Sequence, residues 1–149
     1  ALIEILQTGS SKDALESGHC AIINIDLDDL KGLNDYHGHA VGDAALKIAA
    51  ERIRGTLRQD DKVIRMGGDE FVCLVFDRNQ TDAAERVVNR LNLAFSTPKD
   101  LGGHRHIVTA SIGVAISNGD EDWDTLFRRS DAEMYRTKRS GCERGLRLA

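Results

Sequence analysis

VIRMGGDEFVCLVF, residues 63–76, consists of two apolar runs joined by a Gly-Gly pair and two adjacent carboxylates, and it contains no proline. The pattern predicts a β-hairpin with acidic side chains at its tip. Glycine allows a positive φ or a close approach of the backbone to a ligand, whereas Asp69 and Glu70 place two negative charges where an ordinary hairpin needs none. We therefore interpret the hairpin tip as a site for a metal ion and a nucleotide.

Helices and strands are expected on both sides of this hairpin. The run CAIINI, residues 20–25, is short, apolar and β-branched, which is typical of a buried central strand. Apolar residues at helical spacing predict the helices, with Pro98 and Gly141 as stop signals. The expected elements are helices over residues 42–57, 81–95 and 123–139 and strands over residues 20–25 and 106–116, besides the hairpin. Strands mixed with helices predict an α/β sandwich with some antiparallel pairing.

The length, charge and cysteine content restrict the class of protein. A chain of 149 residues is long enough for one domain that buries roughly two-thirds of its unfolded surface. A net charge of -4 without clusters of Lys or Arg argues against a nucleic-acid-binding protein. The three cysteines are too few and too scattered for a disulfide framework, which favours a reducing cytoplasm.

We expect the chain to be one domain of a longer protein. Residues 1–19 are interpreted as an N-terminal helical remnant or linker, with a broken helix over residues 2–6 and 12–17, and residues 20–149 as the main domain. The chain begins with Ala, so we expect a sensor or membrane anchor to lie upstream. No apolar run reaches the roughly 18 residues of a membrane span, and we expect no direct membrane contact.

Five motifs, in order along the chain, resemble those of the GGDEF domain of diguanylate cyclases. They are DLDDLK at residues 26–31 (DLDxFK in the family), NDYHGHAVGD at residues 34–43 (NDxxGHxxGD), the literal GGDEF at residues 67–71, SIGVA at residues 111–115, and a segment similar to ADxALYxAK at residues 130–138. The resemblance implies a mixed, largely antiparallel central sheet flanked by helices, as in nucleotidyl cyclases and the polymerase palm. It also implies the condensation of two GTP molecules into cyclic di-GMP and two pyrophosphates.

The resemblance implies a metal site at the hairpin tip. Asp26 and Glu70 resemble the family's metal ligands, together with the carbonyl of Leu27. Asp69 resembles the residue near the 3′-hydroxyl, which acts as a ligand or assists deprotonation. Two Mg²⁺ or Mn²⁺ ions per active half-site are implied, and such ions favour a few hard oxygen ligands shared with substrate phosphates. For single residues, the alternatives are a helix cap at Asp26 and a polar turn at the hairpin tip.

The resemblance also implies a binding site for GTP. Asn34 and Asp43 resemble the guanine readers, and a carboxylate can accept from the N1–H and N2–H groups of guanine, which adenine does not match. At Asp43 the alternative is a helix N-cap. The other residues that the resemblance assigns to the substrate are Lys31 and Lys138 at the phosphates, His39 in the GHxxGD match, and Gly67 and Gly68 in close backbone contact. Their alternatives are solvated lysines and an ordinary tight turn.

The segment before the hairpin resembles the family's product-inhibition site. Arg58 and Asp61 form an RxxD motif, and five residues separate Asp61 from Gly67, as in the family. An Arg can fork onto a phosphate or stack on guanine, and an Asp can accept from the guanine edge. We expect Arg90 to complete this site. The alternative is an Arg at a helix end and a turn-forming Asp.

The chain departs from the family's pattern in three places. The DxLTGLxNR segment expected before the first strand is absent, and Leu30 stands where the family usually has Phe. Cys142 stands where the family's KxxGRN-like ending has an Arg. A missing Arg–phosphate contact would weaken phosphate binding by about 1–3 kcal/mol.

Two functions therefore remain open. The first is a diguanylate cyclase that works as a homodimer, since one half-site cannot close a two-fold symmetric ring. The intact Asp26, Asp69 and Glu70 favour it. The second is a catalytically weak or inactive domain that acts as a cyclic di-GMP receptor, which Cys142 favours. A synthase for another purine is disfavoured by Asp43.

Two histidine pairs raise a zinc hypothesis. His37 with His39, and His104 with His106, stand two residues apart, which places both side chains on one face of an extended segment. No third or fourth ligand follows at a plausible spacing, so a zinc site is disfavoured.

Overall fold

The computed structural model of the 149-residue chain describes residues 15, 16, 18–76, 82–101 and 103–148, and only the backbone of residues 104 and 141–148. Residues 15 and 16 are helical, but the rest of the broken helix expected over residues 2–6 and 12–17, and most of the expected segment 1–19, lie outside these ranges. Among the described residues, no helix combines the length and the apolar character that a membrane span needs.

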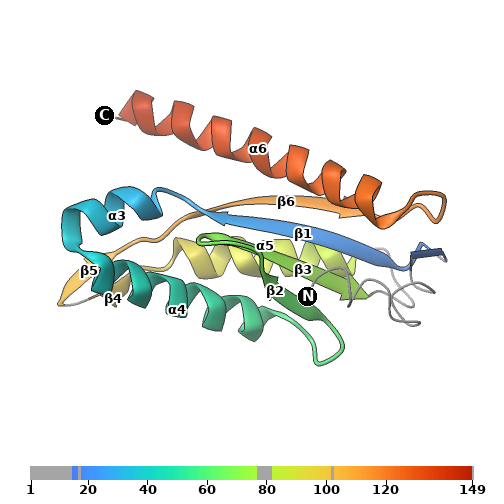
Figure 1. The fold of residues 1–149 in the computed structure, drawn as a ribbon, viewed down its shortest axis with the longest axis horizontal. Coiled ribbons are helices and arrows are strands. Elements are labelled where there is room, and N and C mark those ends of the chain that lie inside the picture. Colours follow the sequence, from blue (N-terminus) through green and yellow to red (C-terminus); the bar gives the residue numbers. More distant parts are fainter. Residues whose placement is uncertain (1–14, 17, 77–81, 102, 149) are drawn as a thin grey trace.

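A four-stranded antiparallel sheet forms the centre of the domain (Figure 1). Its strands, in spatial order, are β2 (Lys62–Arg65), β3 (Glu70–Phe76), β1 (Cys20–Leu27) and β6 (Ala110–Ile116). Each neighbouring pair in this sheet is antiparallel. The hairpin predicted at residues 63–76 is confirmed as β2 and β3, and the run at residues 20–25 is confirmed as a central strand.

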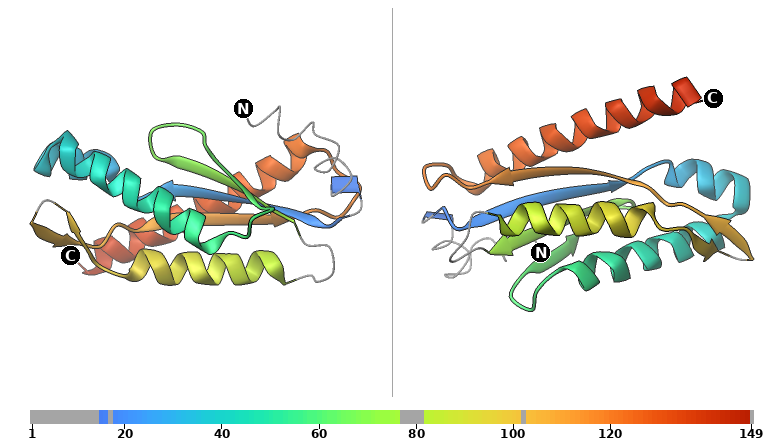
Figure 2. Two further views of the ribbon diagram at one scale, coloured as in Figure 1. Left: turned by 90° about the horizontal axis from the view of Figure 1, so that it is seen from below. Right: turned by 180° about the vertical axis from the view of Figure 1, so that it is seen from behind.

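Helices cover both faces of the sheet (Figures 1 and 2). The helix α6 (Trp123–Leu148) lies on one face, and α4 (His39–Thr56) and α5 (Ala83–Ser96) lie on the other. At one end, α3 (Leu30–His37) follows β1, and a small hairpin of β4 (Lys99–Leu101) and β5 (His104–His106) lies close to α4. The predicted sandwich of helices around a largely antiparallel sheet is therefore confirmed.

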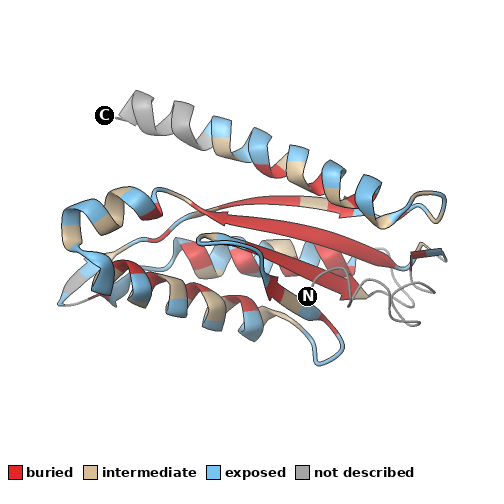
Figure 3. Cartoon of the chain, viewed as in Figure 1, coloured by how far each residue is buried: buried red, intermediate tan, exposed pale blue. Residues whose placement is uncertain are grey.

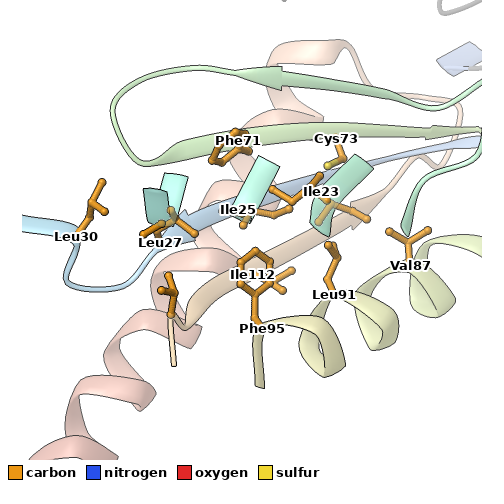
Figure 4. Packing of buried hydrophobic residues seen from close by; sticks show 14 of the residues in the cluster. Ile23, Ile25, Leu27, Leu30, Phe71, Cys73, Val87, Leu91, Phe95 and Ile112 are labelled. Atoms are coloured by element: carbon orange, nitrogen blue, oxygen red, sulfur yellow. The ribbon is translucent and has the colours of Figure 1, made fainter. Parts of the chain in front are cut away.

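The central strand β1 is buried along its whole length (Figure 3). Side chains alternate between the two faces of a strand. One set, which includes Ile23 and Ile25, packs in the cluster shared with α4 and α5 (Figure 4). The other set includes Ile22, which packs with Leu126 of α6. Asp26 belongs to this second set, so its carboxylate faces α6.

The single strand expected over residues 106–116 is two strands. The first, β5, ends at His106 and pairs with β4, whereas β6 begins at Ala110 and pairs with β1. Between them, the carbonyl of Thr109 accepts from the N–H of Asp28 at 2.9 Å, which ties the chain to the turn after β1. The alternating pattern runs through both strands, so the sequence does not reveal the break.

Two helix ends differ from the prediction. The helix α4 already begins at His39, because Gly38, with a φ of +91°, turns the chain directly from α3 into α4. The helix α6 continues past Gly141 to Leu148, so Gly141 is not a C-cap. A glycine inside a helix costs about 1 kcal/mol relative to alanine but does not by itself end the helix.

Candidate nucleotide and metal site

The three acidic residues expected at the metal site lie together at one end of the sheet. Asp26, near the end of β1, is the direct cross-strand partner of Glu70, the first residue of β3. The N–H of Leu27 donates to the carbonyl of Asp69 at 3.0 Å, which bonds the hairpin tip to the end of β1. The antiparallel register therefore brings together acids that are far apart in the sequence.

Asp26 is a buried carboxylate with one paired and one unpaired oxygen. Its Oδ2 accepts from Nζ of Lys138, on α6, at 2.9 Å. Its Oδ1 is buried and has no hydrogen-bond partner among the described residues. Burial raises the pKa of Asp26, the bond from Lys138 opposes this rise, and repulsion from Asp69 adds to it. A buried oxygen without a partner is costly, so this atom favours a ligand.

Glu70 adds to the negative potential of the site. The residue as a whole is exposed, but partial burial of its carboxyl group raises its pKa. Repulsion from Asp26, Asp69 and Asp131 raises the pKa further, and Lys138 opposes the rise. Three other carboxylates therefore repel that of Glu70, and a cation bound beside it would relieve this repulsion.

The donor set fits a hard divalent cation that is shared with a substrate. It consists of the carboxylates of Asp26 and Glu70 and the carbonyl of Leu27, and magnesium commonly takes one or two carboxylates plus waters and phosphates. In the described part of the chain, no three His, Cys, Asp or Glu side chains are grouped to hold a metal ion. The rings of His37 and His106 do lie close, with centroids 4.6 Å apart, but no third such side chain joins them among the described residues. Water molecules or substrate phosphates would complete the coordination of a metal ion here.

The guanidinium group of Arg65 holds the Gly-Gly turn of the hairpin. Its Nε donates to the carbonyl of Gly67 at 3.0 Å, and its Nη2 donates to the carbonyl of Gly68 at 2.9 Å. Neither Gly67 nor Gly68 has a positive φ, so the prediction that glycine is needed here for a positive φ is wrong. A Cβ added at Gly67 would meet only Oε2 of Glu70, at 4.0 Å, and one added at Gly68 would meet no described atom within 4 Å. A close approach of a ligand to this backbone stays a prediction, beside the alternative of an ordinary tight turn.

Asp28 is a site residue to which the motif resemblance assigns no role. Its Oδ1 accepts from Oγ of Ser111 at 2.7 Å, and its Oδ2 accepts from Oγ1 of Thr109 at 2.8 Å. These bonds hold the turn after β1 against β6 and so help to orient the carbonyl of Leu27. The signal in the sequence is its place as the second Asp of the DLDxFK match, whereas its partners in and before β6 follow from the fold.

Asn34 lies against Gly42 where α3 meets α4. A Cβ on Gly42 would lie 1.5 Å from Oδ1 of Asn34, so the two helices approach this closely only with glycine there. That Oδ1 is buried and has no hydrogen-bond partner in the described ranges. Asp43 is exposed and lies inside α4, so the N-cap alternative for Asp43 is wrong.

Asp43 lines a cavity of about 420 Å³ between α4 and the hairpin. Arg65 lines the same cavity, so its side chain lies between the cavity and the Gly-Gly turn. Lys31 and His39 are exposed in the first turns of α3 and α4. The remaining lining residues of the cavity are Leu46, Lys47, Ala50, Arg54, Val63 and Phe71.

The RxxD segment has a different kind of acid from the metal site. Asp61 is buried, and its Oδ2 and Oδ1 accept from the backbone N–H groups of Arg58 and Phe76, at 2.9 Å and 3.1 Å. Asp61 therefore forms the turn after α4 and ties it to the end of β3. The side chains of Arg58 and Arg90 are exposed. The structure thus has the turn-forming contacts that were the alternative for Asp61.

Comparison with known proteins identifies the family. Residues 1–144 match the family model described as "Diguanylate cyclase, GGDEF domain". The chain belongs to the GGDEF domain family. It is 41% identical over 125 residues to the bifunctional diguanylate cyclase/cyclic di-GMP phosphodiesterase MucR of Pseudomonas aeruginosa, and 34% identical over 145 residues to the diguanylate cyclase DgcP of that organism. These alignments cover 81% and 97% of this chain but only 18% and 22% of the two relatives.

A solved structure supports the same assignment. The crystal structure of the GGDEF domain of YfiN from Pseudomonas aeruginosa superposes with a TM-score of 0.83 at 34% identity, over 93% of this chain and 88% of that chain. The predicted fold class is therefore that of a GGDEF domain.

Gly113, in the SIGVA motif of this GGDEF domain, allows α6 to lie directly on β6. A Cβ at Gly113 would lie 2.1 Å from the carbonyl oxygen of Ser130 and 2.2 Å from the backbone nitrogen of Met134. This close approach holds the helix that carries Lys138 to Asp26. Cys142 lies one turn further along α6, where the structure describes only the backbone.

Proposed function

We propose that this GGDEF domain is a diguanylate cyclase, which condenses two GTP molecules into cyclic di-GMP and releases two pyrophosphates. The observation that carries the proposal is the cross-strand pair of Asp26 and Glu70 beside Asp69, with one buried Asp26 oxygen left without a described partner. Acids arranged in this way suit a site that binds divalent cations together with a triphosphate.

The roles at the metal site follow from this proposal. Asp26, Glu70 and the carbonyl of Leu27 would hold two Mg²⁺ or Mn²⁺ ions per half-site. Such ions neutralise charge on a triphosphate and favour ionisation of an attacking hydroxyl. Asp69, at the hairpin tip, would serve as a further ligand or accept the proton of the 3′-hydroxyl. Asp28 would keep the carbonyl of Leu27 in place through Ser111 and Thr109.

The substrate would bind from the α3–α4 end of the site to the hairpin tip. Asn34 and Asp43 would read guanine, and the unpartnered amide oxygen of Asn34 and the cavity beside Asp43 support this assignment. The residues that would contact the ribose or the phosphates are Lys31, His39, Lys138 and the backbone of Gly67 and Gly68. The open space around the two glycines supports a close approach there.

Catalysis would require a homodimer. Cyclic di-GMP is two-fold symmetric, and each 3′-hydroxyl must attack the α-phosphate held by the other subunit. A single domain with one GTP site offers only half of this arrangement. We further propose a cytoplasmic location and regulation by a sensor domain elsewhere in a longer protein, since the chain spans about a fifth of its relatives MucR and DgcP.

We also propose product inhibition at the RxxD site. Arg58 and Arg90 are exposed and carry the guanidinium groups that would bind the phosphates or stack on the bases of cyclic di-GMP. Each oxygen of Asp61 already accepts one backbone N–H but retains a lone pair for the guanine edge. Calorimetric titration with cyclic di-GMP tests this assignment, and equal affinities of wild type and Arg58→Ala would exclude it.

The second candidate function is a receptor for cyclic di-GMP with little or no catalysis. Cys142 favours this alternative, because a thiol cannot replace the bidentate contacts of an Arg with a triphosphate. The intact Asp26, Asp69 and Glu70 favour the cyclase.

One assay separates the two functions. The purified protein is incubated with GTP and magnesium, and the products are resolved by chromatography beside Glu70→Ala and Asp69→Asn. We expect cyclic di-GMP from wild type and strongly reduced amounts from both variants. If wild type formed no product even when an added coiled coil enforced dimerisation, the cyclase proposal would be abandoned in favour of the receptor.

A further inference from the structure

Lys138 and Asp26 form an ion pair that joins α6 to the end of β1. Their charged atoms are 2.9 Å apart, and the side chain of Asp26 is 11% exposed while that of Lys138 is 36% exposed. A carboxylate this buried depends on its counter-charge more strongly than an acid in a surface pair does. The bond therefore supplies a positive charge where the metal-binding acids meet.

The surroundings of this pair are acidic. The ammonium group of Lys138 bonds to Asp26, and the carboxylates of Asp69 and Asp28 add their attraction. Asp26 offers its second oxygen without a described partner, but a metal ion bound there would stand close to the ammonium group. Two cations on one carboxylate repel each other.

We propose that the ammonium group of Lys138 neutralises Asp26 in the nucleotide-free domain, in the place of a divalent metal ion. Lys138 must then leave Asp26 before a divalent metal ion binds tightly. This inference rests on the proposed function. The phosphates of an incoming nucleotide offer Lys138 another anion, so the nucleotide and the metal ion assist each other's binding. As long as Lys138 stays bonded to Asp26, the affinity of the acids for a metal ion is lowered, so little metal binds when no nucleotide is present.

The proposal predicts opposite effects of one substitution on two ligands. Removing the charge in Lys138→Met should make Mn²⁺ binding without nucleotide about tenfold tighter, a size typical of coupling between two ligands. The same substitution should weaken binding of a non-hydrolysable GTP analogue. Free Mn²⁺ is measured by electron paramagnetic resonance, and analogue binding by calorimetry. A purely structural role of Lys138 would weaken both.

Two control variants separate this exchange from a general loss of positive charge. Arg139→Met removes an exposed charge from the next position of α6 and should leave Mn²⁺ affinity unchanged. Lys31→Met removes a lysine proposed at the phosphates and should weaken the analogue without affecting Mn²⁺. Equal Mn²⁺ affinities of wild type and Lys138→Met, or a tighter Mn²⁺ complex of Arg139→Met by the same factor, would overturn the inference.

A further variant tests the metal site itself. Asp26→Asn should abolish the Mn²⁺ binding of both wild type and Lys138→Met. If Asp26→Asn left Mn²⁺ binding unchanged, the metal site in the proposed function would be wrong, and so would the proposed role of Lys138 at Asp26. If Asp26→Asn abolished binding but Lys138→Met did not strengthen it, only the inference would fail. Should Lys138→Met not fold, Lys138→Gln serves the same test, with the rise in melting temperature on adding Mn²⁺ as the readout.

Discussion

Asp26 and Asp61 are equally buried, each with 8% of its surface exposed, but their oxygens are satisfied in opposite ways. Both oxygens of Asp61 accept backbone N–H groups. Asp26 has one oxygen bonded to Lys138 and one without a described partner. Burial alone therefore does not show whether an acid has both oxygens bonded within the fold or keeps one oxygen without a described partner. The hydrogen bonds of its oxygens make that distinction.

The largest effect is expected for the catalytic rate of Asp26→Asn. The substitution removes a proposed metal ligand and should lower cyclic di-GMP formation by about 10²- to 10³-fold, the scale of losing one group that stabilises transition-state charge. The free energy of unfolding should change by no more than about 1 kcal/mol, because no backbone group loses its partner. Initial rates and urea unfolding measure the two quantities. A near-wild-type rate would show that Asp26 is not needed for catalysis.

The next largest effect is expected for the stability of Asp61→Ala. Two partly buried backbone N–H groups lose a charged acceptor, so the free energy of unfolding should fall by about 3 kcal/mol. Asp61→Asn should lose about half as much, since an amide offers only one acceptor oxygen. Urea denaturation measures both variants. If Asp61→Ala unfolded at the same urea concentration as wild type, the structural role of Asp61 would be wrong.

The helix α4 allows a second comparison between the two regions, because Gly42 lies beside the candidate nucleotide site and Gly55 lies close to the RxxD segment. Gly42→Ala places a methyl group 1.5 Å from Oδ1 of Asn34 and should lower the free energy of unfolding by about 1–3 kcal/mol, with weaker GTP binding. At Gly55 a Cβ meets no described atom within 4 Å, so Gly55→Ala should raise stability by up to about 1 kcal/mol. Thermal unfolding of the two variants measures the contrast, and a loss of similar size in both would contradict it.

The smallest effect is expected in the pH dependence of unfolding. The pKa of Asp26 is raised in the folded domain, so the folded state binds this proton more tightly than the unfolded state does. Its contribution to stability is therefore largest at acidic pH and is lost as the pH rises through the folded pKa. Asp26→Asn cannot ionise and should lose less stability than wild type over the range from acidic to neutral pH. Melting temperatures measured in a series of buffers test the difference, and parallel curves would speak against a raised pKa.

The elements with strong local signals were predictable from the sequence. The hairpin at residues 63–76 and strand β1 have long apolar runs bounded by turn residues, and both are confirmed. The small hairpin of β4 and β5 was not predictable, because three residues are too few to show alternation. The end of α6 was placed too early because Gly141 is a stop signal only when the helix takes a left-handed turn there.

The family could be recognised from the sequence alone, and the candidate site residues could be proposed from it. The motifs with Asp26 and with Glu70 can be recognised in order along the chain, because the residue types that hold metals and nucleotides recur at set spacings. The sequence could not show how the oxygens of Asp26 and Asp61 are bonded, since both are acids beside apolar strands. The packing of segments that are far apart in the sequence sets that difference. The register of β1 with β3 places Glu70 opposite Asp26, and the approach of α6 at Gly113 brings Lys138 to Asp26. The turn after α4 and the end of β3 instead each direct one backbone N–H group to Asp61.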